Sequence, residues 1–167
     1  NTFAEAVTFF PSPDSFVFGP DEYLNHVQRV KQAVRTPVIG SLNGMTPGAW
    51  LSYARLIEQA GADALELNVY HAPTDFETSG GEVERQIVDM VRQVKQGLKI
   101  PVAVKLSPFF TAFAHFARQL DGVGADGLVL FNRYYDPDID VQELNVVRTL
   151  QLSDSSELRL RLAGIAA

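Results

Sequence analysis

The fold is decided by the stretch Gly61–Val69, which reads Gly-Ala-Asp-Ala-Leu-Glu-Leu-Asn-Val. Its glycine can end a helix, and the largely apolar residues after the aspartate are typical of a short buried strand. The Gly-Ala-Asp triplet recurs 63 residues later as Gly124–Asp126, and there too an apolar run follows and leads to an asparagine. A repeated strand–helix unit favours a barrel built by duplication over an open nucleotide-binding sheet.

Outward from this stretch, short apolar strands alternate with amphipathic helices. Strands are expected over residues 38–42, 64–69, 101–106 and 127–132. Helices are expected to begin near Pro20, Thr46, Ser79, Thr111 and Asp154. Buried strands joined by helical crossovers predict a parallel sheet, and no Gly-x-Gly-x-x-Gly motif of a Rossmann fold follows a strand. We therefore expect an α/β fold, part of a (β/α)8 TIM barrel with about four parallel strands and their crossover helices.

The length limits how much of a barrel this chain can form. A complete (β/α)8 barrel takes about 250 residues. This chain has 167 residues. We expect residues 1–167 to form a single, incomplete barrel domain, in which 1–19 are a Phe-rich loop and 20–167 are successive β/α units.

Composition excludes several kinds of site and partner. The absence of cysteine excludes disulfides, thiolate zinc sites, iron–sulfur clusters and a cysteine nucleophile within this chain. The net charge of −6, with 14 Lys and Arg, argues against nucleic acid or anionic membranes as partners. No apolar run reaches the roughly 18 residues of a membrane span, and the first residues lack a signal-peptide pattern, so we expect a cytoplasmic protein.

Polar side chains occur in or just after each expected strand, toward the end where the active sites of (β/α) barrels lie. They are Ser41, Asn43, Glu66, Asn68, Lys105, Ser107, Asn132 and Arg133. Because the C-terminal ends of parallel strands meet at one rim, we expect these groups to converge there.

Lys105 is the most informative of these residues. A lysine in an apolar strand is costly to bury unless it is paired or directed at an anionic or electron-rich ligand. Its ammonium could serve such a ligand, or it could reach a carboxylate such as Glu66. Asn68 and Asn132 each offer an amide donor and a carbonyl acceptor, which can match the edge of a planar imide or amide heterocycle or can cap the backbone at a strand end.

His71 follows Asn68 by three residues, and from that loop an imidazole could act as a general base. The alternative is an ordinary surface histidine. The three histidines show no metal-binding spacing, so no metal is expected. The alternating Asp136, Asp138 and Asp140 lack the glycine and distal glutamate of a calcium loop and are expected to form a solvated loop.

Three segments in this order, 61–69, 101–108 and 124–133, resemble the dihydroorotate dehydrogenase family, most closely its bacterial dihydroorotate dehydrogenase-like branch. The resemblance implies a (β/α)8 barrel that holds FMN at its C-terminal rim, with this chain supplying the third to sixth strands. It also implies an oxidoreductase of pyrimidine biosynthesis that acts on CH–CH groups. In such an enzyme a base removes a proton from a dihydroorotate-like substrate while a hydride passes to the flavin.

The resemblance also implies roles for single residues. Asn68 would contact both flavin and substrate, Lys105 would hydrogen-bond the flavin and stabilise the negative charge of its reduced form, and Asn132 would hold the orotate-like ring. Ser41 and Asn43, at the same rim, complete the set of candidate cofactor-binding residues.

Two features depart from the family pattern. Family members continue after Leu-Asn with a Ser-Cys-Pro-Asn-like stretch, or a serine variant, that supplies the base, whereas Val69–Pro73 reads Val-Tyr-His-Ala-Pro here. Either His71 is the base in this chain, or this branch uses another substrate. The glycine-rich loops that hold the FMN phosphate in the family are expected to lie outside this chain.

Two other functions fit the same pattern. One is a non-catalytic or truncated barrel fragment with a structural or binding role, and the other is a phosphate-sugar lyase or isomerase that uses Lys105 as a Schiff base. For the flavin enzyme, the expected partners are a small-molecule substrate and a second copy in a homodimer. Neither nucleic acid nor a membrane span is expected.

Overall fold

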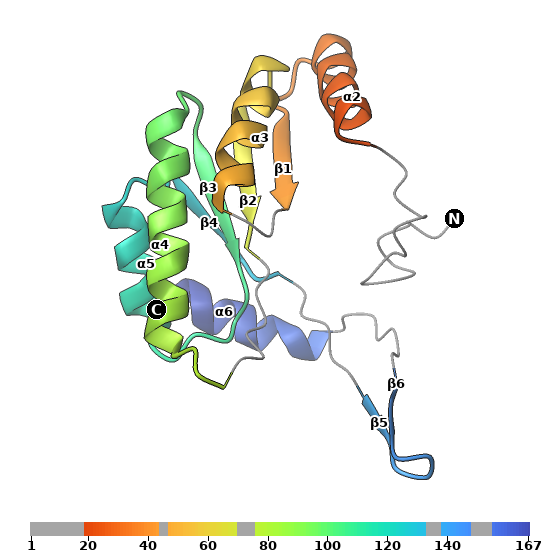
Figure 1. The fold of residues 1–167 in the computed structure, drawn as a ribbon, viewed down its shortest axis with the longest axis vertical. Coiled ribbons are helices and arrows are strands. Elements are labelled where there is room, and N and C mark those ends of the chain that lie inside the picture. Colours follow the sequence, from red (N-terminus) through yellow and green to blue (C-terminus); the bar gives the residue numbers. More distant parts are fainter. Residues whose placement is uncertain (1–18, 44–46, 70–75, 133–137, 148–154) are drawn as a thin grey trace.

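A computed structural model describes residues 19–43, 47–69, 76–132, 138–147 and 155–167 of the chain. Helices and strands alternate along most of it (Figure 1). In chain order they are α2 (Pro20–Ala33), β1 (Ile39–Asn43), α3 (Pro47–Gln59), β2 (Ala64–Asn68), α4 (Gly80–Gly97), β3 (Val102–Leu106), α5 (Phe113–Gly122), β4 (Gly127–Leu130), β5 (Asp138–Asp140), β6 (Asn145–Val147), a 3-10 turn (Ser155–Glu157) and α6 (Leu158–Ala166). The first four strands form one sheet in the order β1-β2-β3-β4, with every neighbouring pair parallel, which confirms the predicted α/β architecture.

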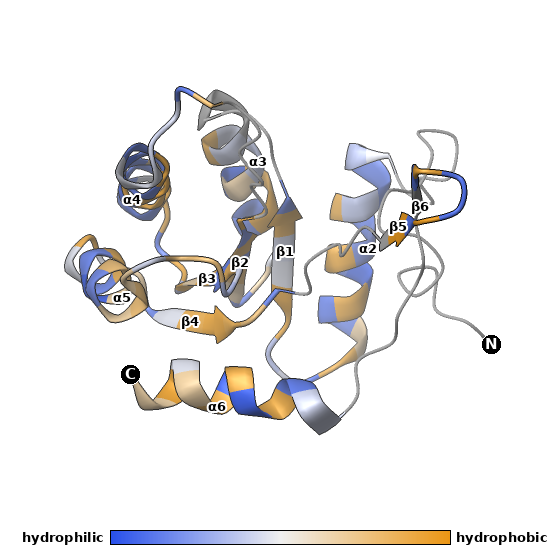
Figure 2. Ribbon diagram, turned by 90° about the horizontal axis from the view of Figure 1, so that it is seen from below, coloured by the Kyte–Doolittle hydropathy of each residue, from blue (hydrophilic) through white to orange (hydrophobic). Residues whose placement is uncertain are grey.

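The two faces of this sheet differ in character. Helices α3, α4 and α5 lie along one face (Figure 2). The strand residues directed at these helices are buried and apolar, and they include Leu42, Leu65, Leu67, Val102, Val104 and Leu106. Alternate residues on β1, β2 and β3 point to the other face, which is partly exposed and carries polar groups. The helix-covered face therefore provides the core, and the opposite face is available for a site.

A carboxylate joins the start of β1 to the start of β2. Asp63 accepts hydrogen bonds from the backbone N–H of Val38, at 2.7 Å, and from Nζ of Lys31 in α2, at 2.6 Å. Gly61, just before it, has a φ of +93°, a left-handed conformation that glycine adopts without steric cost. The bonds from Lys31 and Val38 hold the pKa of the Asp63 carboxyl below its ordinary value.

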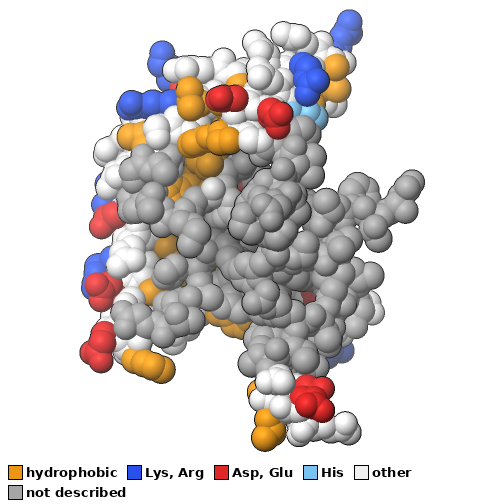
Figure 3. All heavy atoms as spheres, turned by 45° about the vertical axis from the view of Figure 1, so that its right-hand side comes forward, with side chains coloured by type: hydrophobic (Ala, Val, Ile, Leu, Met, Phe, Trp, Pro, Cys, Tyr) orange, Lys and Arg blue, Asp and Glu red, His pale blue; other side chains and the backbone are white. Residues whose placement is uncertain are grey.

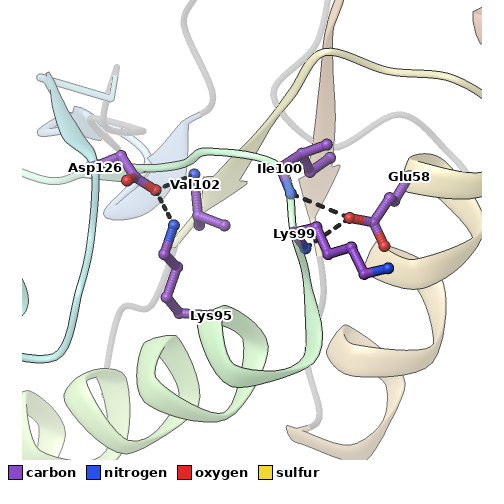
Figure 4. Close-up of polar contacts among 6 residues, drawn as sticks. All are labelled: Glu58, Lys95, Lys99, Ile100, Val102 and Asp126. Carbon is purple, nitrogen blue, oxygen red and sulfur yellow. Dashed lines mark hydrogen bonds and ion pairs between the residues drawn. The ribbon is translucent and has the colours of Figure 1, made fainter.

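The same carboxylate contact recurs between β3 and β4, as Figure 4 shows. Asp126 accepts from the N–H of Val102 at 2.7 Å and also from Nζ of Lys95 in α4. The bonds from Lys95 and Val102 lower the pKa of the Asp126 carboxyl in the same way, and Gly124 has a φ of +96°. The repeated Gly-Ala-Asp triplet thus encodes a repeated structure at the N-terminal end of the strands, where barrel residues serve stability.

Between these two contacts, a third carboxylate fixes the chain that enters β3. Oε1 of Glu58, in α3, accepts from the backbone N–H groups of Lys99, at 2.7 Å, and Ile100, at 3.1 Å (Figure 4). At this end of the sheet, successive strand–helix units are therefore joined by acidic side chains that accept hydrogen bonds from backbone N–H groups.

The prediction of a solvated loop for the aspartates after β4 is wrong for the two that the structure describes. Asp138 and Asp140 belong to β5, which pairs with β6 in an antiparallel hairpin, while Asp136 lies outside the described residues. Oδ1 of Asp140 accepts from the N–H groups of Gln142, at 2.8 Å, and Glu143, at 3.0 Å, and this stabilises the turn. The alternation Asp-Ile-Asp has the period of two that suits a strand. A segment so rich in aspartate is more typical of a loop, which is why a loop is predicted.

The hairpin tip presents apolar residues next to acidic ones. Ile139, Val141 and Leu144 are 64%, 79% and 83% exposed. Figure 3 shows hydrophobic and acidic side chains together at the hairpin, at the bottom of that view.

The last helix begins later than predicted and packs beside β4. Asp154 lies outside the described residues, and the 3-10 turn Ser155–Glu157 leads into α6. A side chain at Gly164 would lie 2.5 Å from the ring of Phe131, so the glycine permits the close approach of α6 to the end of β4. The predicted Phe-rich loop falls almost wholly outside the described residues. In the described part of the chain, no helix has the length and hydropathy needed to cross a bilayer.

Candidate functional site at the C-terminal rim

Three polar residues share one row across the sheet. Asn43 pairs in register with Asn68, and Asn68 pairs with Lys105, so β1, β2 and β3 each present a polar side chain at the same level near their C-terminal ends. In parallel strands, register partners point to the same face, and here it is the face opposite α3, α4 and α5. The predicted convergence of these three residues is confirmed.

Asn132 reaches this row from the segment after β4. Its Nδ2 donates to Oδ1 of Asn68 at 2.7 Å, and its backbone N–H donates to the carbonyl of Leu106 at 2.6 Å. The side-chain bond spans β3 and joins the two asparagines, which are 64 residues apart in the sequence. Two linked amides present both donors and acceptors, which suit the recognition of a heterocycle that has both.

A second polar group lies one row deeper on the same face. Ser41 Oγ donates to Oε1 of Glu66 at 2.9 Å, and the same oxygen lies 3.6 Å from Nζ of Lys105. The side chains of Lys105 and Glu66 are 29% and 19% exposed. The contact with Glu66 that the sequence offered as one explanation of Lys105 is present. At 3.6 Å it is an ion pair that is longer than a hydrogen bond.

Ser107 is the one polar residue among the described ones that is buried, with 7% of its surface exposed. No described residue forms a hydrogen bond with its hydroxyl. It follows β3, two residues beyond Lys105. The sequence places Ser107 at the rim but gives it no role, because only the folded structure shows that none of the described residues bonds to its hydroxyl.

Tyr23 takes part in the site region without having been predicted. Its hydroxyl accepts from the N–H of Ser41 at 2.9 Å and donates to the carbonyl of Ser41 at 3.1 Å, so α2 is tied to β1. The signal for it was a tyrosine four residues before the buried Val27 on α2, which gives an apolar face with a polar tip.

His71 and Arg133 lie outside the described residues, so the proposed base has no described position. Within the described ranges, no group of three His, Asp or Glu side chains is arranged to hold a metal ion.

Comparison with known proteins identifies relatives of this chain. The sequence profile of a family described as dihydroorotate dehydrogenase matches residues 17–151. The NAD(+)-dependent dihydroorotate dehydrogenase B catalytic subunit of Desulforamulus reducens is 34% identical over 128 residues, which cover 75% of this chain and 42% of that protein. The corresponding subunit of Methanocaldococcus jannaschii is 28% identical over 152 residues, covering 88% of this chain and 49% of that protein. The chain thus spans less than half the length of these relatives.

Solved structures confirm the fold. Phosphonopyruvate hydrolase matches with a TM-score of 0.54 at 15% identity, over 75% of this chain and 47% of its own. Dihydrodipicolinate synthase from Agrobacterium tumefaciens matches with a TM-score of 0.52 at 17% identity, over 66% of this chain and 37% of its own. These neighbours are TIM-barrel enzymes, so the four strands and their helices are part of a (β/α)8 barrel.

Proposed function

The chain belongs to the dihydroorotate dehydrogenase family, and from that premise we propose that it supplies the flavin-facing wall of an FMN-dependent oxidoreductase. The proposed reaction transfers a hydride from a dihydroorotate-like substrate, at a CH–CH bond, to the flavin. The observation that carries the proposal is the hydrogen-bonded Asn68–Asn132 pair beside Lys105, on one face at the C-terminal rim.

Each of these residues has a separate task in the proposed reaction. Asn68 and Asn132 orient planar rings through amide donors and acceptors, and their mutual hydrogen bond fixes both side chains before a ligand arrives. Lys105 brings a positive charge to the rim, where it stabilises negative charge that develops on a reduced ring. FMN, when bound, supplies the ring that accepts the hydride.

The buried hydroxyl of Ser107 supports the fit of such a ring. A buried polar group without a partner costs about 1–3 kcal/mol. A heterocycle with ring nitrogens and carbonyl oxygens, bound next to Lys105, would satisfy this hydroxyl as well as the ammonium. Ser41 and Asn43, on β1, extend the same polar face and remain candidates for contacts with the cofactor.

We assign the base to His71 in this proposal. It follows Asn68 by three residues, at the place where the family carries its cysteine or serine, and imidazole has an ordinary pKa near 6.5, suited to proton abstraction. Replacement His71→Ala should slow reduction of the flavin by substrate at least a hundredfold while leaving flavin binding intact. Reduction at the original rate would remove His71 from this role.

A Schiff-base lyase is less well supported by the surroundings of Lys105. A Schiff-base lysine is activated in an apolar pocket or beside another cation. Lys105 instead contacts the carboxylate of Glu66. This environment suits a lysine that acts through its positive charge.

The absorbance of the purified protein tests the proposal most directly. Protein expressed from its complete reading frame should show the oxidised-flavin band near 450 nm and release FMN on denaturation. Lys105→Ala should weaken retention of FMN, and Lys99→Ala, which removes an exposed lysine beyond the other end of β3, serves as the matched control. A colourless protein that FMN does not reconstitute would contradict the proposal.

A homodimer and a cytoplasmic location complete the proposal. Light scattering during size-exclusion chromatography and fractionation of the source cells test these two features.

A further inference from the structure

We infer that Glu66 is a positioning residue for Lys105, and that Ser41 holds Glu66 in place for this task. The inference rests on the proposed function in one respect: it takes the ammonium of Lys105 to be the group that faces the flavin. It adds a residue on the neighbouring strand that determines where that ammonium lies.

The three side chains come from three adjacent strands and meet at one oxygen atom. Ser41 and Glu66 are direct register partners on β1 and β2. Oε1 of Glu66 accepts from Ser41 Oγ at 2.9 Å and lies 3.6 Å from Nζ of Lys105. Glu66 therefore has one short bond that fixes it and one longer ionic contact that guides the lysine.

Neighbouring residues leave room for Lys105 to reach Glu66. The register partner of Glu66 on β3 is Ala103, which lies two residues before Lys105 on the same face. Because alanine ends at Cβ, the stem of Lys105 can pass over it toward Glu66. A larger residue at position 103 would occupy that path.

The ion pair reduces the conformational freedom of a flexible side chain. Lysine has four rotatable side-chain bonds, so an unguided ammonium would occupy many positions. Both groups are largely shielded, at 29% and 19% exposure, which strengthens their attraction relative to a pair in open solvent. The contact is also longer than a hydrogen bond, so the N–H donors of Lys105 are not committed to Glu66.

Glu66 lies two residues deeper in β2 than Asn68, which joins Asn132 at the rim. The carboxylate that contacts Nζ of Lys105 therefore lies nearer the N-terminal end of the strands than the backbone of Lys105. The asparagine pair lies level with that backbone. This arrangement presets the cation beneath the plane where the two amides would hold a ring. Preset charges stabilise developing negative charge without a reorganisation cost at the moment of reaction.

A double-mutant cycle on the flavin-loaded protein from the complete reading frame tests the inference. The midpoint potential of the flavin is measured for the unmodified protein, Glu66→Gln, Lys105→Met and the double variant. Lys105→Met should lower the potential, because a cation near the reduced flavin is lost. Glu66→Gln should lower it by a smaller amount when Lys105 is present and should not lower it in the Lys105→Met background.

Three further variants separate positioning from charge and from folding. Ser41→Ala should shift the potential in the same direction as Glu66→Gln, and Ser41→Thr, which keeps a hydroxyl, should restore it. Glu157→Gln removes a carboxylate that pairs with Arg161 on α6 and should leave the potential unchanged. An unchanged or raised potential in Glu66→Gln would overturn the inference while leaving flavin binding, and thus the proposed function, intact.

A second measurement needs no flavin. The rate of acetylation of Lys105 by acetic anhydride is compared with that of Lys99 by mass spectrometry of peptides. Since the ion pair keeps the Lys105 side chain at a largely shielded position, Glu66→Gln should let it reach the reagent more often and raise the Lys105/Lys99 ratio at least threefold. An unchanged ratio would show that Glu66 does not restrain Lys105, whether or not the protein binds FMN.

Discussion

At the scale of single residues, the direction of one hydrogen bond determines how the rim can be modified. Nδ2 of Asn132 donates and Oδ1 of Asn68 accepts. An aspartate at position 68 would keep the acceptor, whereas an aspartate at position 132 would place two acceptors against each other. The two substitutions make the same chemical change and differ only in which partner loses its amide.

We therefore predict that Asn132→Asp destabilises the protein more than Asn68→Asp does. The expected difference in the free energy of unfolding is about 1 kcal/mol, because the two side chains are only partly buried and water can replace part of the lost bond. Chemical denaturation at pH 7 measures it, with both variants in the same buffer. Equal destabilisation would mean that the bond between the asparagines contributes nothing to the fold.

Removal of the Ser107 hydroxyl should affect protein stability and flavin binding in different directions. Because no described residue bonds to its hydroxyl, Ser107→Ala should leave the free energy of unfolding of the flavin-free protein unchanged or raise it by up to about 1 kcal/mol. If the hydroxyl bonds the ligand, the same variant should bind FMN about fivefold more weakly. Calorimetry and flavin titration give the two values. A marked loss of stability without flavin would show that the hydroxyl has a protein partner.

At the scale of elements, the acidic contacts beneath the strands determine how stability depends on pH. The Lys31 and Val38 bonds lower the pKa of Asp63, and those from Lys95 and Val102 lower the pKa of Asp126. A carboxyl whose pKa is lower in the folded chain than in the unfolded chain stabilises the fold above the unfolded value, near 3.9, and the stabilisation is lost as the pH falls through the folded value.

We predict that Asp63→Asn and Asp126→Asn each lower the melting temperature at pH 7 and weaken its decline below about pH 4. Asp89→Asn is the control, since Asp89 pairs with Arg92 at an exposed site within α4 and should change little. Melting curves from pH 2 to 7 provide the measurement. An acid decline as steep as in the unmodified protein would show that these carboxyls do not cause it.

The elements also show what the sequence could and could not reveal. The first four strands begin and end within about two residues of the predicted bounds, because glycine or proline punctuates continuous apolar runs. The sequence does not predict the hairpin because β5 and β6 have three residues each, so the alternation in Asp-Ile-Asp is too short to distinguish a strand from a loop. Ser79, near which a helix is expected to begin, caps α4 by accepting from the N–H of Glu82 at 3.3 Å, a local interaction that sequence spacing encodes directly.

Tertiary partners were harder to predict than elements. The sequence and the family resemblance predict that Asn68 and Asn132 lie at the same rim. They do not predict the bond between them, which depends on how β2 and the end of β4 align across β3. Tyr23 bonds both backbone groups of Ser41 on the side of β1 away from β2. Its spacing from Val27 indicates a packed tyrosine but does not indicate this partner. The ion pair of Lys105 and Glu66 was predictable as an option because both residues occupy the same face at compatible spacing.

At the scale of the whole molecule, the four-stranded sheet ends at β1 and β4, and in a (β/α)8 barrel each strand pairs with a neighbour on both sides. Backbone amides in β2 and β3 are hydrogen-bonded within a sheet flanked on both sides. Half of those in β1 and β4 face an edge, where the Tyr23 hydroxyl bonds the N–H of Ser41. Local opening at an edge needs fewer bonds to break, so edge amides exchange faster with solvent.

Hydrogen exchange can therefore show whether further strands close this wall into a barrel. In a protein made only of residues 1–167, amides of β2 and β3 should exchange at least tenfold more slowly than those of β1 and β4. In the protein from the complete reading frame, closure would pair both edges, and β1 and β4 should become as protected as β2 and β3. Mass spectrometry of peptides covering each strand measures both cases, with the β5–β6 hairpin as the fast-exchanging reference. If the β1 and β4 amides still exchange fast in the longer protein, these strands pair with no further strands. The sheet would then stay open, and the rim could not exclude water from a flavin.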